Sequence, residues 1–130
     1  MAGCPTGYQS HGSHCYKFVN QKTSWTQAEA ACNAEGGHLA SIPDQETNDF
    51  LASLSSGYTW IGGRRLEAGQ DVWGWSDGSE WSYTNWGRGQ PDNVGGKQNH
   101  LAINHGGVGK WDDGKNGQSI NRGYICQKDA

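Results

Sequence analysis

Apolar and polar positions alternate over residues 16–19, and this alternation predicts a strand near the start of the chain. The period of the apolar positions then changes from that of a strand to that of a helix. Ser24 followed by Gln27 is the capping-box pattern that opens a helix, and Gly36-Gly37 is a typical end. The apolar residues between these points recur at helical spacing: Trp25, Ala28, Ala31 and Cys32. We therefore predict a first helix from Trp25 to just before the glycine pair.

A second helix is predicted after a short extended link over residues 39–42. Pro43-Asp44 marks its start. The apolar stripe formed by Phe50, Leu51 and Leu54 gives this helix one face to bury, and we expect it to end near Gly57.

The second half of the chain is predicted to hold short strands joined by a long loop region. Residues 58–61 form a strand that we expect Gly62-Gly63 to end, and residues 101–103 and 124–126 are the closing strands. Between residues 62 and 99 only residues 73–75 suggest a short strand, and a loop region of that length is usually functional. The order of elements predicts an α+β fold, with two helices and a small antiparallel sheet, in a single domain over residues 1–130.

Composition narrows the classes of partner. Hydrophobic residues make up 33% of the 130 residues, but 7 Trp and 21 Gly allow a chain to fold around a few large side chains. The formal net charge is −3 and the longest basic run is Arg64-Arg65, so we expect no nucleic-acid partner. No apolar run approaches the ~20 residues of a membrane span. An oligomer is compatible with the sequence.

The cysteines are even in number and irregularly spaced, with no Cys-x-x-Cys pair: Cys4, Cys15, Cys32 and Cys126. Disulfides in an oxidising compartment explain them better than a redox or zinc site. Four cysteines allow three pairings, of which Cys4–Cys15 with Cys32–Cys126 is the most economical. The chain starts Met1-Ala2-Gly3 without an apolar signal segment, which we interpret as a secreted, extracellular domain at its mature start.

Oxygen-bearing side chains gather in two loop-like segments, Gln90-Pro91-Asp92 and Trp111-Asp112-Asp113. Ca²⁺ takes roughly six to eight oxygen ligands, and a proline between two ligands stiffens the loop that carries them. Adjacent acids suit metal ligation better than the spaced acid–base pair of an enzyme. The chain also has no His-Glu-x-x-His motif. These features predict a Ca²⁺ site and no enzymatic activity.

The order of these motifs resembles that of the C-type lectin-like domain over nearly the whole chain. Cys4-Pro5-Thr6-Gly7-Tyr8 with Cys15-Tyr16 is similar to the N-terminal hairpin of its long form, and Trp60-Ile61-Gly62-Gly63 to its central motif. The remaining matches follow in the family's order: the helix from Trp25 to Cys32, Asn85-Trp86, Gln90-Pro91-Asp92, Trp111-Asp112-Asp113 and Cys126.

The resemblance implies the C-type lectin fold, with a long calcium-binding loop region and a Ca²⁺ that binds sugar hydroxyls directly. The implied metal ligands are Gln90, Asp92, Gln98, Asp112 and Asp113. The first four of these would also contact the sugar. In this family Gln-Pro-Asp accompanies galactose-type sugars, so we predict that the partners are glycans with galactose-type terminal sugars.

An aromatic ring often stacks on the sugar in galactose-type members, but residues 94–97 carry none. The candidates to replace it are Trp75, Trp81 and Trp86, and we take Trp75 as the predicted sugar contact.

The chain departs from the family pattern in its ligands and in one disulfide. Gln98 stands where the family usually has Glu, and Asp112 where it has Asn, so three carboxylates are kept. Both pairs, Gln90/Asp92 and Gln98/Asp112, now run amide then acid, which changes the pattern of donors and acceptors. The family's inner disulfide would fall at His100 and near Asn116, and neither position is Cys. We expect His100 and His105 to be exposed.

A second hypothesis is a binding domain of the same fold without sugar activity. It includes a type II antifreeze-like ice-binding protein and a protein-recognition module. Polar loop residues such as Thr84, Asn85 and Asn93 are compatible with ice binding.

Overall fold

The computed structural model describes residues 4–67, 70–91, 96, 98–104, 107–116 and 123–129. Its elements, in chain order, are β1 (Gln9–His11), β2 (His14–Val19), α1 (Trp25–Ala34), β3 (His38–Leu39), α2 (Gln45–Leu54), β4 (Thr59–Arg65), β5 (Trp73–Trp75), β6 (Gln98–Ile103), β7 (Trp111–Lys115) and β8 (Gly123–Asp129).

The strands form one mixed sheet with the order β1-β2-β8-β4-β6-β7, to which β3 and β5 are attached through β8 and β4. The pair β4–β8 is parallel and the others are antiparallel. The predicted antiparallel sheet thus includes one parallel pairing, between β4 and β8. β8 lies between β2, to which it is antiparallel, and β4, to which it is parallel.

Both helices begin where local sequence signals place them. The Ser24 hydroxyl accepts a hydrogen bond from the Gln27 N–H at 3.1 Å, and the Gln27 side chain accepts one from the Ser24 N–H at 3.4 Å. The Asp44 carboxylate caps α2 by accepting from the Thr47 N–H at 2.8 Å. These caps satisfy N–H groups that a helix leaves without internal partners, and they confirm both predicted starts.

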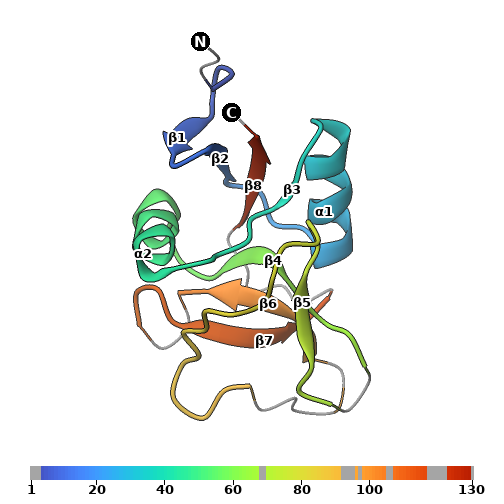
Figure 1. Ribbon diagram of the computed structural model, residues 1–130. Coiled ribbons are helices and arrows are strands. Elements are labelled where there is room, and N and C mark those ends of the chain that lie inside the picture. Colours follow the sequence, from blue (N-terminus) through green and yellow to red (C-terminus); the bar gives the residue numbers. More distant parts are fainter. Residues whose placement is uncertain are drawn as a thin grey trace.

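Apolar side chains form two clusters, one on each side of the sheet. The α1-side cluster contains Trp25, Cys32, Trp60, Ala102 and Tyr124, whereas the α2-side cluster contains Leu51, Ile61, Leu101, Trp111 and Ile125. Consecutive strand residues, such as 60 and 61 or 101 and 102, enter different clusters because side chains alternate across a strand. Figure 1 shows the two helices on opposite sides of the strands between them.

Gly62 and Gly63 do not end β4, contrary to the prediction, because the strand continues to Arg65. A Cβ atom at Gly62 would lie 2.6 Å from the Leu39 carbonyl oxygen, and one at Gly63 would lie 2.5 Å from the Leu101 side chain. The glycines are required by close packing of neighbouring segments inside a strand.

The disulfides pair as predicted, Cys4 with Cys15 and Cys32 with Cys126. The first closes the hairpin of β1 and β2. The second joins α1 to β8 across 94 positions of sequence.

The two positions of the missing inner disulfide contact the first turn of α1. The His100 ring packs on Trp25 with centroids 4.5 Å apart, and the residue is partly buried, so the prediction that it is exposed is wrong. Burial, with a smaller contribution from the Arg64 charge, lowers the pKa of His100 to about 4. The Asn116 carbonyl oxygen accepts from the Trp25 N–H at 3.0 Å, and its side chain accepts from the Thr26 N–H at 2.9 Å. His105 lies outside the described residues.

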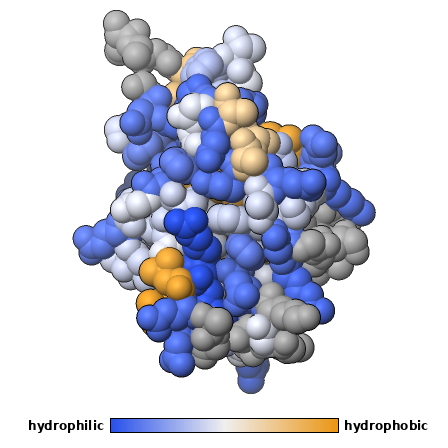
Figure 2. Space-filling model, turned by 90° about the vertical axis from the view of Figure 1, so that its right-hand side faces the viewer, coloured by the Kyte–Doolittle hydropathy of each residue, from blue (hydrophilic) through white to orange (hydrophobic). Residues whose placement is uncertain are grey.

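One face of the molecule is mainly polar. Figure 2 shows this face, on which hydrophilic residues dominate and apolar residues form only small, separate groups. None of the helices in the described part of the chain has both the length and the apolar character needed to cross a bilayer.

Candidate functional site

Three of the predicted ligands lie in strands and not in loops. Asp112 and Asp113 belong to β7, and Gln98 is the first residue of β6, its antiparallel neighbour. In this register Asp112 lies opposite Ala102, and Asp113 opposite Leu101. The pairing of β6 with β7 thus brings three predicted ligands to one edge of the sheet.

The loop that carries Gln90 lies beside the start of β7. The Gly87 N–H donates to the Trp111 carbonyl oxygen at 2.8 Å, and the Gln90 N–H donates to the Gly87 carbonyl oxygen at 3.0 Å. The peptide bond between Gln90 and Pro91 is cis. Asp92, the remaining predicted ligand, lies outside the described residues. Figure 1 shows this loop region at the end of the molecule away from both termini.

Asp113 is fully buried and forms an ion pair with Arg65. The Arg65 Nη2 atom lies 2.9 Å from the Asp113 Oδ2 atom, and the two side chains are 1% and 0% exposed. The same nitrogen donates to the Gln98 carbonyl oxygen at 3.1 Å. Arg65 therefore connects two of the residues that were predicted to hold a metal.

Further contacts hold the guanidinium in place. Its Nη1 atom donates to the Gln70 carbonyl oxygen at 2.6 Å and to the Asp71 carboxylate at 2.5 Å. Its carbon lies 4.6 Å from the centre of the Trp73 ring, a cation–π distance.

Asp112 is also buried, and its carboxylate accepts a hydrogen bond from the Tyr58 hydroxyl. Consecutive residues of a strand point to opposite faces. Asp112 lies opposite Ala102, of the α1-side cluster, while Asp113 lies opposite Leu101, of the α2-side cluster. Tyr58 and Arg65 thus bind the two carboxylates on different faces of β7, and the structure does not bring these carboxylates together.

Trp75, the predicted sugar contact, lies in the α2-side cluster and is 3% exposed. Its ring packs against Trp81 and Trp111, with centroids 4.7 and 5.6 Å away. The structure therefore gives Trp75 a core position, because β5 turns this side chain inward, and leaves its ring faces covered. Trp81 and Trp86 are partly buried at the edge of the same cluster.

Arg65 and Tyr58 were not identified as site residues from the sequence. A signal for Arg65 existed, since a strand running through Gly62-Gly63 places Ile61, Gly63 and Arg65 on the same, inward face. The prediction that the glycine pair ends the strand left Arg65 outside that strand. No local signal identifies the Tyr58 contact, because it depends on packing between distant segments.

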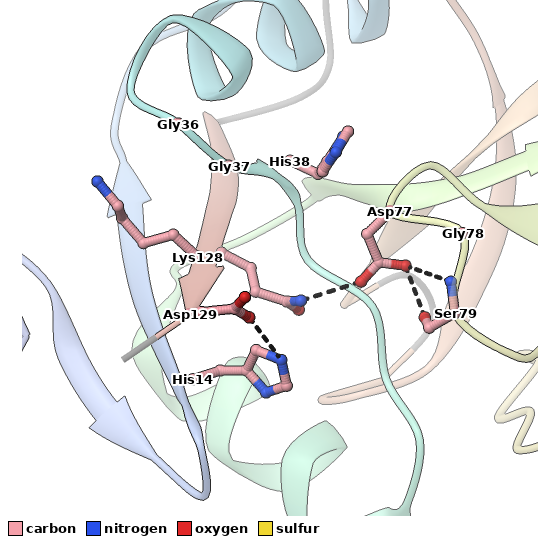
Figure 3. Close-up of a pocket in the computed structure, with 10 residues that line it drawn as sticks. His14, Gly36, Gly37, His38, Asp77, Gly78, Ser79, Lys128 and Asp129 are labelled. Atoms are coloured by element: carbon pink, nitrogen blue, oxygen red, sulfur yellow. Dashed lines mark hydrogen bonds and ion pairs between the residues drawn. The ribbon is translucent and has the colours of Figure 1, made fainter.

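A surface pocket of about 370 Å³ lies apart from these residues. Figure 3 shows it between β2, β3, β8 and the loop after β5. Several of its polar groups bond to one another. Asp77 accepts hydrogen bonds from Ser79 and Gln127, and the His14 Nε2 atom lies 3.4 Å from the Asp129 carboxylate. None of the predicted ligands lines this pocket.

A family model described as the lectin C-type domain matches residues 21–128. The chain belongs to the C-type lectin domain family. The resemblance found in the sequence is thereby confirmed, and with it the fold. Lectin domains bind carbohydrates, and a member of this family is a binding domain, not an enzyme.

Relatives of this C-type lectin domain include proteins of different named activities. Ladderlectin of Oncorhynchus mykiss is 40% identical over 129 residues, which cover 94% of this chain and 67% of that protein. Galactose-specific lectin nattectin of Thalassophryne nattereri is 40% identical over 97 residues, which cover 70% of this chain and 60% of that protein. The solved structure of a calcium-independent type II antifreeze protein matches with a TM-score of 0.89 and 32% identity, covering 98% of this chain and 95% of that one. The chain thus spans 67% of the length of ladderlectin and 60% of the length of nattectin.

The donors present fit Ca²⁺ in their chemistry. Carboxylate and amide oxygens are ligands that this cation prefers. The side-chain oxygen of Asn99, next to Gln98, is buried without a hydrogen-bond partner among the described residues, so it is a further oxygen suited to a cation. The described carboxylates alone do not form a group of three able to hold a metal.

Proposed function

We propose that this C-type lectin domain binds galactose-type glycans in a Ca²⁺-dependent manner, in an extracellular setting. The observation that carries the proposal is the position of Gln98, Asp112 and Asp113 on paired strands, with the loop of Gln90 beside them. The two disulfides support an oxidising compartment.

The residues that would hold the ion are Gln90, Asp92, Gln98, Asp112 and Asp113. When bound, Ca²⁺ would supply direct coordination of two sugar hydroxyls. The amide groups of Gln90 and Gln98 donate hydrogen bonds to the sugar, while the carboxylates of Asp92 and Asp112 accept them. A sugar is selected by the match between its hydroxyls and this pattern. No bond of the sugar is made or broken.

The first test is a glycan array with Ca²⁺ and with EDTA, using wild type and Asp92→Ala. We expect binding to galactose-terminated glycans in Ca²⁺, and its loss both in EDTA and in the variant. Asp49→Ala is the matched control, because Asp49 is an exposed acid on α2. It should bind as wild type does. Glycan binding that is unaffected by EDTA and by Asp92→Ala would contradict the proposal.

Ice binding is the second candidate, favoured by the similarity to the calcium-independent type II antifreeze protein. Thermal hysteresis in solutions of the purified domain separates the two. Hysteresis without glycan binding would favour the second candidate, and glycan binding without hysteresis would favour the first.

A further inference from the structure

We propose that Arg65 is a resident cation of the candidate calcium site, whose guanidinium competes with Ca²⁺ for Asp113 and lowers the calcium affinity of the domain. The inference rests on the proposed function only in taking Asp113 as a calcium ligand.

The charge of Arg65 is permanent and buried. An arginine side chain does not lose its proton in proteins, so this positive charge is present at every working pH. Its side chain is 1% exposed and that of Asp113 is 0% exposed. Buried charges are tolerated when they are paired, and the Arg65 guanidinium pairs with the buried Asp113 carboxylate at 2.9 Å as well as with the exposed Asp71 carboxylate at 2.5 Å. Asp113 therefore already has the cation that a calcium ligand needs.

The guanidinium does not leave this position freely. It would have to give up the Gln98 and Gln70 carbonyl oxygens, the Asp71 carboxylate and the face of Trp73. These contacts come from β5, β6 and the segment that follows β4. The surrounding strands thus hold the positive charge against Asp113.

A calcium ion at Asp113 meets this charge in one of two ways. It displaces the guanidinium, which loses its buried partners, or it binds beside the guanidinium, which repels it at short range. Both lower the affinity. Removing the charge of Arg65 is therefore expected to raise the calcium affinity, although it deletes a contact that the folded protein makes.

The neighbouring residue provides a matched control. Arg64 is exposed, whereas Arg65 is buried, so Arg64→Gln removes the same charge from the same strand without touching Asp113. We would titrate Ca²⁺ alone, without sugar, into wild type, Arg65→Gln and Arg64→Gln by calorimetry. Arg65→Gln should bind Ca²⁺ at least about tenfold more tightly than wild type, and Arg64→Gln should match wild type. Equal or weaker binding by Arg65→Gln would overturn the proposal.

Thermal melting keeps the test decisive if Arg65→Gln folds poorly. Asp113 then loses the Arg65 guanidinium, so added Ca²⁺ should restore folding and raise the Tm of Arg65→Gln more than that of wild type. Arg65→Gln/Asp113→Asn, which removes both charges, should fold without Ca²⁺ and show no such rise. A Tm of Arg65→Gln that does not respond to Ca²⁺ would count against the resident cation.

The inference and the proposed function fail separately. If wild type binds galactose with Ca²⁺ and Arg65→Gln gains no calcium affinity, the role of Arg65 is rejected and the function stands. If Arg65→Gln gains calcium affinity but wild type does not bind galactose, the proposed function is rejected and the role of Arg65 stands.

Discussion

Trp111 connects the hydrophobic core to the strand that carries the candidate ligands. Its ring is fully buried, and its Nε1–H donates to the Asn48 side chain of α2 at 2.7 Å. The Asn48 amide donates in turn to the Gly109 carbonyl oxygen at 3.1 Å, just before β7. A buried polar side chain with both ends bonded positions its neighbours, because each unmade bond costs the full desolvation of its partner.

Asn48→Ala should therefore lower the free energy of unfolding by about 2–3 kcal/mol, because it leaves the buried Trp111 N–H without its partner. Urea denaturation followed by tryptophan fluorescence measures the change. The neighbouring exposed substitution Asp49→Ala serves as the control, with an expected effect within about 0.5 kcal/mol. Equal losses in the two variants would show that the Asn48 contact does not stabilise the fold.

At the scale of elements, the two disulfides join cysteines that are separated by very different lengths of chain. Cys32–Cys126 joins α1 to β8 over 94 positions, and Cys4–Cys15 closes a hairpin over 11. A longer closed loop removes more entropy from the unfolded chain. The long bridge also lies in the α1-side cluster, where α1, β4 and β8 meet.

Cys32→Ala/Cys126→Ala should lower the free energy of unfolding by about 4–5 kcal/mol, and Cys4→Ala/Cys15→Ala by about 2–3 kcal/mol. Guanidinium denaturation of both double variants under non-reducing conditions gives the comparison. A larger loss from the hairpin bridge would be inconsistent with stabilisation that grows with loop length.

At the scale of the whole molecule, Glu29 ties three separate parts of the chain together. Its carboxylate, on α1, accepts from the Leu39 N–H at 2.9 Å and from the Ser76 hydroxyl at 3.0 Å, and it pairs with His38 at 2.7 Å. Burial by itself raises the pKa of Glu29, but these bonds and one from Asn33 outweigh burial and hold its pKa below 4.5. The charged form is thus favoured in the folded state.

This depressed pKa makes part of the stability depend on pH. The contribution of Glu29 is fully present above the unfolded value of 4.5 and is lost as the pH falls through the lower folded value. Wild type should exceed Glu29→Gln in stability at pH 6, and the gap should narrow below pH 4.5. Urea denaturation of both proteins at several pH values measures this difference in stability. A gap that stays constant into acid would rule out this linkage.

The sequence by itself determined the two helix starts and the family. Ser24, Gln27 and Asp44 act within one helical turn, so their effect can be read locally. The identity and order of the motifs were sufficient for the C-type lectin fold, although the β4–β8 pair runs parallel. The cysteine pairing required a choice among three alternatives, and the economical one is correct.

The tertiary structure alone decided how the candidate site is neutralised. Gly62-Gly63 stays within a strand because Leu39 and Leu101 pack against it, and that continuation carries Arg65 inward to Asp113. The carboxylates of the site were predicted from the sequence, but the buried cation beside one of them was not. The physical reason is that Arg65 and Asp113 are distant along the chain, and only the register of strands around β6 places them within 2.9 Å.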